Sequence, residues 1–214
     1  MKLYLRIGFG EEDDQKTILE KEKEYAEFED FRIFTVTWNL AGHQPDLSLN
    51  LSLMFNFQDN PVPDLVVINL QEYIDLNAVN VVVGPNQSDS RISVWREIIY
   101  SNLQKMGDFV FVRHQQLVGV LILIFAKSAI KNKINRVETD IVKTGLGGNF
   151  GNKGAAIIKM YIDDTSFCFI NCHLESGNKS NNQRIQNIVD IHQKAFQQEG
   201  VGKRRVIYNT LSFS

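Results

Sequence analysis

A glycine-rich stretch that ends in an asparagine and a lysine is the first candidate for chemistry in this sequence. Glycines at positions 145, 147, 148 and 151 are followed at once by Asn152 and Lys153. Glycine lets the backbone approach a ligand closely, and a lysine ammonium binds phosphate as a point charge. Asn152 stands where a Walker A loop needs glycine, and Phe150 excludes a G-x-G-x-x-G motif. We therefore expect a phosphate-binding loop of another geometry. The alternative is a flexible hairpin between two strands.

The next stretch, 167–173, alternates as a strand and places Asn171 and His173 on the same face. A lone histidine is most often a structural residue, but an amide and an imidazole that share one strand end favour a site. Cys168 and Cys172 lie about 13 Å apart on such a strand, beyond the reach of a disulfide. We expect both cysteines to be reduced and buried.

Two earlier apolar stretches also end in polar side chains. The stretch Phe31–Asn39 predicts a buried strand that ends at Asn39, and Asp64–Glu72 predicts a strand that ends at Gln71 and Glu72. A glutamate in such a place is otherwise most often a surface carboxylate. If these strand ends converge with the Asn171–His173 end, one site holds a carboxylate, amides, an imidazole and a lysine. Mg²⁺ takes one or two carboxylates and completes its shell with water and substrate oxygens, so this set suits hydrolysis of a phosphate ester.

Charge favours a small anionic ligand over bulk DNA. The chain of 214 residues is 43% hydrophobic and 22% charged, which predicts one soluble globular domain. Residues 1–30 hold ten acidic and five basic side chains, a charge of −5, so the remainder carries +3 of the total of −2. A mildly cationic body suits an anionic small molecule or a lipid head group.

Cysteine usage and hydropathy predict a cytoplasmic protein. The sequence has two cysteines, the first ten residues are too broken for a signal peptide, and the apolar run Leu117–Ala126 is too short to span a membrane. We expect that run to be a buried strand.

The remaining periodicity predicts a layered sandwich, an α/β (α+β) fold in which helices flank a β-sandwich. A short helix and a loop are expected within residues 43–63, and a final helix over Asn181–Glu199, with Arg184 near its start. The helix Val94–Met106 should bury Trp95, Ile98, Ile99 and Leu103; the final helix should bury Ile185, Ile188, Val189 and Phe196; further strands are expected at Phe109–Arg113, Gly119–Lys127, Ile134–Lys143 and Arg205–Tyr208.

Five stretches together resemble the inositol polyphosphate 5-phosphatases, a branch of the endonuclease/exonuclease/phosphatase superfamily. They are FTVTWNLAG at 34–42, DLVVINLQEYIDL at 64–76, QLVGVLILIFAK at 116–127, TGLGGNFGNKGAAIIKM at 144–160 and FINCHLESG at 169–177. GNKGA together with NCHLESG is the most specific part, and the resemblance runs from about residue 31 to about residue 191. It implies a DNase I-like fold and a Mg²⁺-dependent phosphatase of phosphoinositides or soluble inositol polyphosphates.

The resemblance also implies roles for single residues. Asn39 would contact the phosphate and the metal shell, and Glu72 would be the Mg²⁺ ligand. Asn171 and His173 would hold and polarise the scissile 5-phosphate. Lys153 would recognise a neighbouring ring phosphate, with Asn152 and Arg184 as further substrate-binding residues. Peripheral contact with the cytosolic face of a membrane fits such a substrate, whereas nucleic acid or an obligate protein partner is not expected.

Three words of that family are absent from these 214 residues: Gly-Asp-x-Asn, Trp-Cys-Asp-Arg and Ser-Asp-His, the last of which supplies the catalytic His–Asp pair. We therefore expect residues 31–214 to be the N-terminal two-thirds of the catalytic domain, preceded by an acidic helical segment at 1–30, and the sandwich to be incomplete at its C-terminus. The 214 residues alone are expected to be inactive. A non-catalytic fragment that binds a phosphoinositide or a protein is the alternative, and a nucleic-acid enzyme is disfavoured by the charge.

Overall fold

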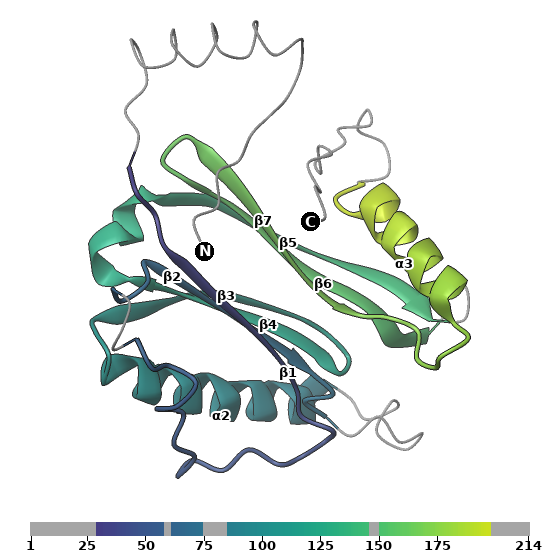
Figure 1. Ribbon diagram of the computed structural model, residues 1–214, viewed down its shortest axis with the longest axis horizontal. Coiled ribbons are helices and arrows are strands. Elements are labelled where there is room, and N and C mark those ends of the chain that lie inside the picture. The colour runs from purple at the N-terminus through teal and green to yellow at the C-terminus, as the bar shows by residue number, and fades with distance from the viewer. Residues whose placement is uncertain (1–28, 58–60, 75–84, 146–149, 198–214) are drawn as a thin grey trace, which may run out of the picture.

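The computed structural model describes residues 29–57, 61–74, 85–145 and 150–197. They form two sheets and two α-helices in four layers: helix α2, the first sheet, the second sheet and helix α3 (Figure 1). The first sheet has the order β1-β2-β4-β3 and the second the order β5-β6-β7. The elements are β1 (Ile33–Asn39), β2 (Leu65–Gln71), α2 (Pro85–Gln104), β3 (Phe109–Leu117), β4 (Val120–Lys127), a 3-10 helix η1 (Ser128–Lys133), β5 (Ile134–Gly145), β6 (Phe150–Ile162), β7 (Thr165–His173) and α3 (Asn181–Lys194).

The first sheet is covered on its outer face by α2. Apolar residues at helical spacing put one side of α2 against Val66, Ile68 and Leu70 of β2, because even-numbered residues of that strand face outward. The four predicted helix residues Trp95, Ile98, Ile99 and Leu103 are at most 2% exposed, which confirms the predicted buried face.

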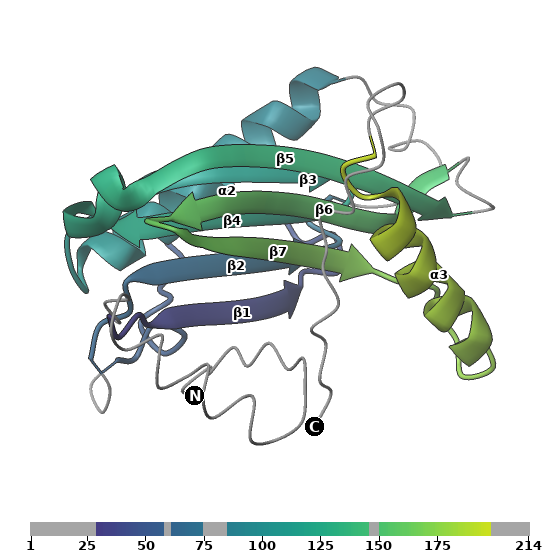
Figure 2. The ribbon, with the colours of Figure 1, turned by 90° about the horizontal axis from the view of Figure 1, so that it is seen from above.

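The second sheet packs on the inner face of the first (Figure 2). Odd-numbered β2 residues such as Val67 meet Ile158 and Met160 of β6 in one apolar layer. On β7 the predicted alternation is confirmed: Phe167 and Phe169 join this layer, whereas Ile170 and Cys172 face the side of the sheet that α3 covers. The layered sandwich follows from strands that are apolar on both faces, since each face must be covered.

Parallel pairing of β1 with β2 aligns the strand ends that carry polar residues. The register pairs Asn39 with Gln71, and antiparallel β4 begins opposite Gln71 at Val120. In the second sheet His173 at the end of β7 pairs with Gly154, directly after Lys153. The polar strand ends therefore lie at one end of the sandwich.

Several predictions about single elements were wrong. The strand β1 is half-exposed, because it lies at the edge of its sheet. No helix forms within the described part of 43–63. Lys153 was expected in the glycine-rich loop, but it lies on strand β6.

The final helix buries a different face from the predicted one. In α3 the buried residues are Asn187 and Ile191. Of the four predicted residues, Ile185 is 53% and Val189 38% exposed, whereas Ile188 and Phe196 are half-buried. The helix packs against the second sheet along a narrow face, so only some of its apolar residues contact the sheet. The predicted strand Arg205–Tyr208 and most of the acidic segment at 1–30 lie outside the described residues.

The cysteines are both free, as predicted, but Cys168 is exposed. Burial raises the pKa of Cys172 to about 11, so its thiol stays protonated at neutral pH. Within the described ranges, no helix has the length and apolarity needed to cross a membrane.

Candidate functional site

Asn39, at the end of β1, holds the carboxylate of Glu72, which follows β2 in the same sheet. The amide Nδ2 of Asn39 donates to Oε1 of Glu72 at 3.0 Å, and its Oδ1 accepts from the backbone N–H of Ala41 at 2.9 Å. Both ends of the Asn39 amide are therefore used, one to orient the carboxylate and one to shape the turn after β1. The parallel register of β1 and β2 brings the two side chains together.

The backbone of Glu72 is held in an uncommon conformation. Its φ is 49°, in the left-handed region that costs a non-glycine residue roughly 1–2 kcal/mol. The Glu72 carbonyl accepts from the N–H of Gly42 at 2.8 Å, and the N–H of Tyr73 donates to the carbonyl of Gly119 at 3.2 Å. Hydrogen bonds from loops on both sides thus fix the backbone of this residue.

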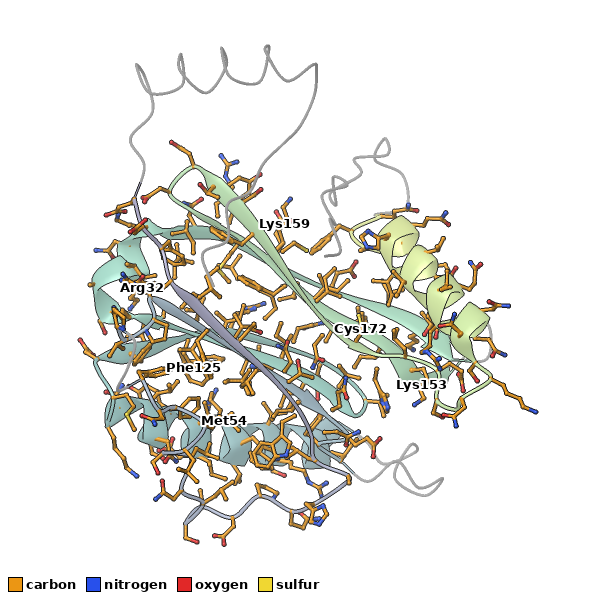
Figure 3. All side chains as sticks on the ribbon, viewed as in Figure 1. Arg32, Met54, Phe125, Lys153, Lys159 and Cys172 are labelled. Carbon is orange, nitrogen blue, oxygen red and sulfur yellow. The ribbon has the colours of Figure 1, made fainter. Side chains whose placement is uncertain are left out.

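The second sheet contributes an imidazole and an ammonium. Nζ of Lys153 lies 2.9 Å from Nε2 of His173, and the same Nε2 lies 3.5 Å from Oε1 of Glu72. Asn39, Glu72, His173 and Lys153 thus form a continuous series of contacts across both sheets, which we call the polar row. Figure 3 shows Lys153 near the end of the second sheet and close to α3.

The environment of His173 keeps its ring neutral. Burial and the Lys153 ammonium lower the pKa of His173 below its usual value, and the carboxylates of Glu72 and Glu175 offset this only in part. An ammonium donates to Nε2 only when that nitrogen is unprotonated, so the ring proton belongs on Nδ1. Nδ1 is buried and has no hydrogen-bond partner within the described structure. The approach of Nε2 to the Glu72 carboxylate is therefore neither an ion pair nor a hydrogen bond at neutral pH, and Lys153 is the group that binds this nitrogen.

Stability is expected to depend on this histidine below neutral pH. Because the folded pKa of His173 is lowered, the unfolded chain binds more protons as pH falls below the unfolded value of about 6.5, and unfolding becomes easier. The stabilising difference is complete above that value and is lost as pH falls toward the folded pKa. Urea unfolding at pH 7.5 and 5.5 should show this loss in the wild type and a smaller loss in His173→Gln. An equal loss in both proteins would contradict the assignment.

Asn171 contacts backbone carbonyls inside the sandwich. Its Nδ2 donates to the carbonyls of Leu70 at 3.0 Å and Leu121 at 2.9 Å, and the residue is 2% exposed. Both amide hydrogens are thus used inside the sandwich, which leaves none to donate to a phosphate. In this structure Asn171 therefore bonds to the backbone of the first sheet, and its contact with a phosphate stays a prediction.

Arg184 also contacts backbone in this structure. Its Nη1 donates to the carbonyls of Gly177 at 2.9 Å and Glu175 at 3.3 Å, and Asn187 accepts from the N–H of Glu175 at 3.2 Å. The start of α3 thus anchors the loop that follows His173, and Arg184 does not contact the polar row. The side chain of Asn152 lies outside the described part. Gln71, which donates to the carbonyl of Cys172 on β7, was not among the predicted site residues, because its acceptor is 101 residues away in the chain.

A divalent cation fits the donors that are present. The carboxylate of Glu72 is 33% exposed, and Asn39 uses one of its two oxygens. Within the described residues, no group of three or more His, Cys, Asp or Glu side chains could enclose a metal. A single exposed carboxylate suits Mg²⁺, which keeps several waters and binds through one or two carboxylates, rather than Zn²⁺.

Comparison with known proteins identifies the family of this chain. The family model "Endonuclease/Exonuclease/phosphatase family 2" matches residues 36–209. The chain is 32% identical over 190 residues to a probable inositol polyphosphate 5-phosphatase of Schizosaccharomyces pombe, which covers 78% of this chain and 16% of that protein. It is 32% identical over 195 residues to human synaptojanin-2, with 84% of this chain and 13% of that protein covered.

A solved structure gives the same result. It is the inositol polyphosphate 5-phosphatase domain of SPsynaptojanin in complex with inositol (1,4)-bisphosphate and calcium ion, with a TM-score of 0.67 and 27% identity. The match covers 86% of this chain and 52% of that one, so the chain spans about half the solved domain. The predicted family and the DNase I-like layered fold are confirmed.

Proposed function

Since the chain belongs to endonuclease/exonuclease/phosphatase family 2, we propose that its polar row is part of a site for Mg²⁺-dependent hydrolysis of the 5-phosphate of phosphoinositides or soluble inositol polyphosphates. The observation that carries the proposal is the proximity of four groups: Asn39 is hydrogen-bonded to Glu72, and Nε2 of His173 lies 3.5 Å from the Glu72 carboxylate and 2.9 Å from the Lys153 ammonium. This arrangement places the Glu72 carboxylate, which would bind a cation, close to the Lys153 ammonium, which would bind a phosphate. The similar 5-phosphatases support the choice of substrate.

The residues of the row have separate tasks in this proposal. Glu72 would hold Mg²⁺, oriented by the Asn39 amide, and a bound Mg²⁺ supplies neutralisation of phosphoryl charge. Lys153 has three ammonium donors, of which one meets His173, so two can serve the oxygens of a ring phosphate. Neutral His173 keeps the lysine directed toward the carboxylate end of the row without adding a second positive charge.

For the 214 residues themselves we propose ligand binding with little or no turnover. Their sequence contains neither the Ser-Asp-His word nor the Gly-Asp-x-Asn word. Groups that transfer protons in the transition state typically raise the rate by a factor of about 10² to 10⁴. The alternative from another class is a binding fragment for a phosphoinositide or a protein. The proposed place of action is the cytosol, with peripheral contact to a phosphoinositide-bearing membrane, and without nucleic acid or an obligate protein partner.

Phosphate release tests the proposal for these residues. The 214-residue chain is mixed with phosphatidylinositol 4,5-bisphosphate vesicles in Mg²⁺ and, separately, in EDTA, beside a Glu72→Ala variant. We expect no release above the level of Glu72→Ala. Release that needs Mg²⁺ and disappears in Glu72→Ala would show that other residues replace the absent His–Asp pair and that the chain is an active phosphatase.

A further inference from the structure

Two amide side chains bridge the sheets directly behind the polar row. Gln71 of β2 donates through Nε2 to the carbonyl of Cys172 on β7 at 2.6 Å. In the opposite direction, Asn171 of β7 donates through Nδ2 to the carbonyls of Leu70 and Leu121, at 3.0 and 2.9 Å. Each sheet thus sends one amide to the backbone of the other, and we call Gln71 and Asn171 the amide pair.

The two members of the amide pair lie one and two residues from groups that meet in the row: Gln71 precedes Glu72, and Asn171 comes two residues before His173. Gln71 directly precedes Glu72, and the carbonyl that it binds belongs to Cys172, which directly precedes His173. A shift of one sheet along the other would therefore separate Glu72 from His173 at the same time as it broke these bonds.

The rest of the contact between the sheets cannot fix that position so well. Apart from the polar row, it is formed mainly by apolar side chains such as Val67, Ile122 and Ile158. Apolar burial is non-directional, whereas a hydrogen bond requires a defined distance and angle. Burying an amide in such a layer is unfavourable unless its hydrogens are bonded, and Asn171 is 2% exposed with both hydrogens used. One relative placement of the sheets is therefore favoured over its neighbours.

We propose that Gln71 and Asn171 are positioning residues, which hold Glu72 against His173 and Lys153 and so set the affinity of the site for a phosphorylated inositol. The inference rests on the proposed function of the row. Binding geometry tolerates errors of only about 0.5 Å, so loss of either bridge should weaken binding even where the fold survives.

Two matched controls separate positioning from stability. Gln104 donates to the carbonyl of Phe109 at 2.6 Å, as Gln71 does to Cys172. Asn102 is 3% exposed and donates to the carbonyls of Ile98 and Leu49, as Asn171 does to its two carbonyls. Both controls lie at the end of α2, which packs on the opposite face of the first sheet.

The experiment compares Gln71→Met with Gln104→Met, and Asn171→Leu with Asn102→Leu. Calorimetric titration with inositol 1,4,5-trisphosphate in Mg²⁺ should show about tenfold weaker binding in Gln71→Met and Asn171→Leu. Each control variant should bind with nearly the wild-type affinity, even where its melting temperature falls as much as that of the site variant. In a Glu72→Gln background, Gln71→Met should have a much smaller effect, because it acts through Glu72. Equal losses in site variants and controls, or no loss in Gln71→Met, would overturn the inference.

A second readout does not need the ligand. At pH 8, where His173 is neutral, the ¹⁵N chemical shift of its Nε2 reports the contact with Lys153. It should move in Gln71→Met and stay in place in Gln104→Met, and an unchanged shift in both would also count against the amide pair. Should the wild type not bind inositol 1,4,5-trisphosphate at all, the proposed function fails, and this shift still decides the role of Gln71.

Discussion

Replacing Lys153 by methionine is expected to weaken binding of inositol 1,4,5-trisphosphate by about 10- to 100-fold. Methionine keeps the length and apolar stem of the side chain but removes the ammonium, and a hydrogen bond to a charged group contributes about 1.5–3 kcal/mol. The loss should shrink as salt is raised, because part of it is electrostatic. Calorimetric titration at two salt concentrations measures both effects.

The control for this variant is Lys159→Met. Lys159 lies on the same strand, well away from Lys153 (Figure 3), and its ammonium lies 5.8 Å from the ring centroid of Tyr161 and 6.0 Å from that of Phe196. It should leave the affinity nearly unchanged. Equal weakening by the two variants would mean that general positive charge, and not the polar row, attracts the ligand.

Replacing Gly154 by alanine is expected to destabilise the fold by roughly 3 kcal/mol or more, among the largest effects of a single substitution. A Cβ at this position would lie 2.1 Å from the carbonyl oxygen of Val142 and 2.7 Å from Cδ2 of Leu117. The φ of Gly154 is 147°, a backbone angle that residues with a side chain rarely adopt. Since the closest obstacle is backbone, the strands must separate next to Lys153.

The matched substitution is Gly107→Ala, for which the nearest atom would be a Phe109 ring carbon at 3.4 Å. That variant should fold with nearly wild-type stability. Urea unfolding of both proteins makes the comparison. A Gly154→Ala protein as stable as Gly107→Ala would show that β5 and β6 do not approach as closely at Gly154 as described.

The elements of the fold were largely predictable because their signals are local. The strand ends at Asn39 and Gln71 follow from runs of β-branched and apolar residues that stop at polar ones, and the buried face of α2 follows from a period of 3.6 residues. The exposure of Ile185 and Val189 was not predictable, because it depends on how far α3 reaches over the second sheet. A pattern shows that a face is apolar but not which neighbour covers it.

The residue types that meet in the candidate site were predictable, whereas the hydrogen bonds between the two sheets were not. Glu72, His173 and Lys153 were singled out from their places beside apolar strands, and they meet in the structure. Asn171 was placed on the correct face of β7, but its partners are carbonyls of another sheet, 50 and 101 residues away in the chain. The hydrogen bond of Gln71 was not predictable for the same reason, since its acceptor is also 101 residues away. Hydrogen bonds between sheets leave no periodic signal.

The central claim is that the polar row binds a phosphorylated inositol together with a divalent cation. The most direct test is calorimetric titration of the 214-residue chain with inositol 1,4,5-trisphosphate, in Mg²⁺ and in EDTA, for the wild type and for Glu72→Ala. We predict binding to the wild type that weakens in EDTA, and weak binding to a folded Glu72→Ala protein whether or not Mg²⁺ is present. Binding of equal strength in all four titrations, or no binding to a folded wild type in Mg²⁺, would contradict the assignment of the site.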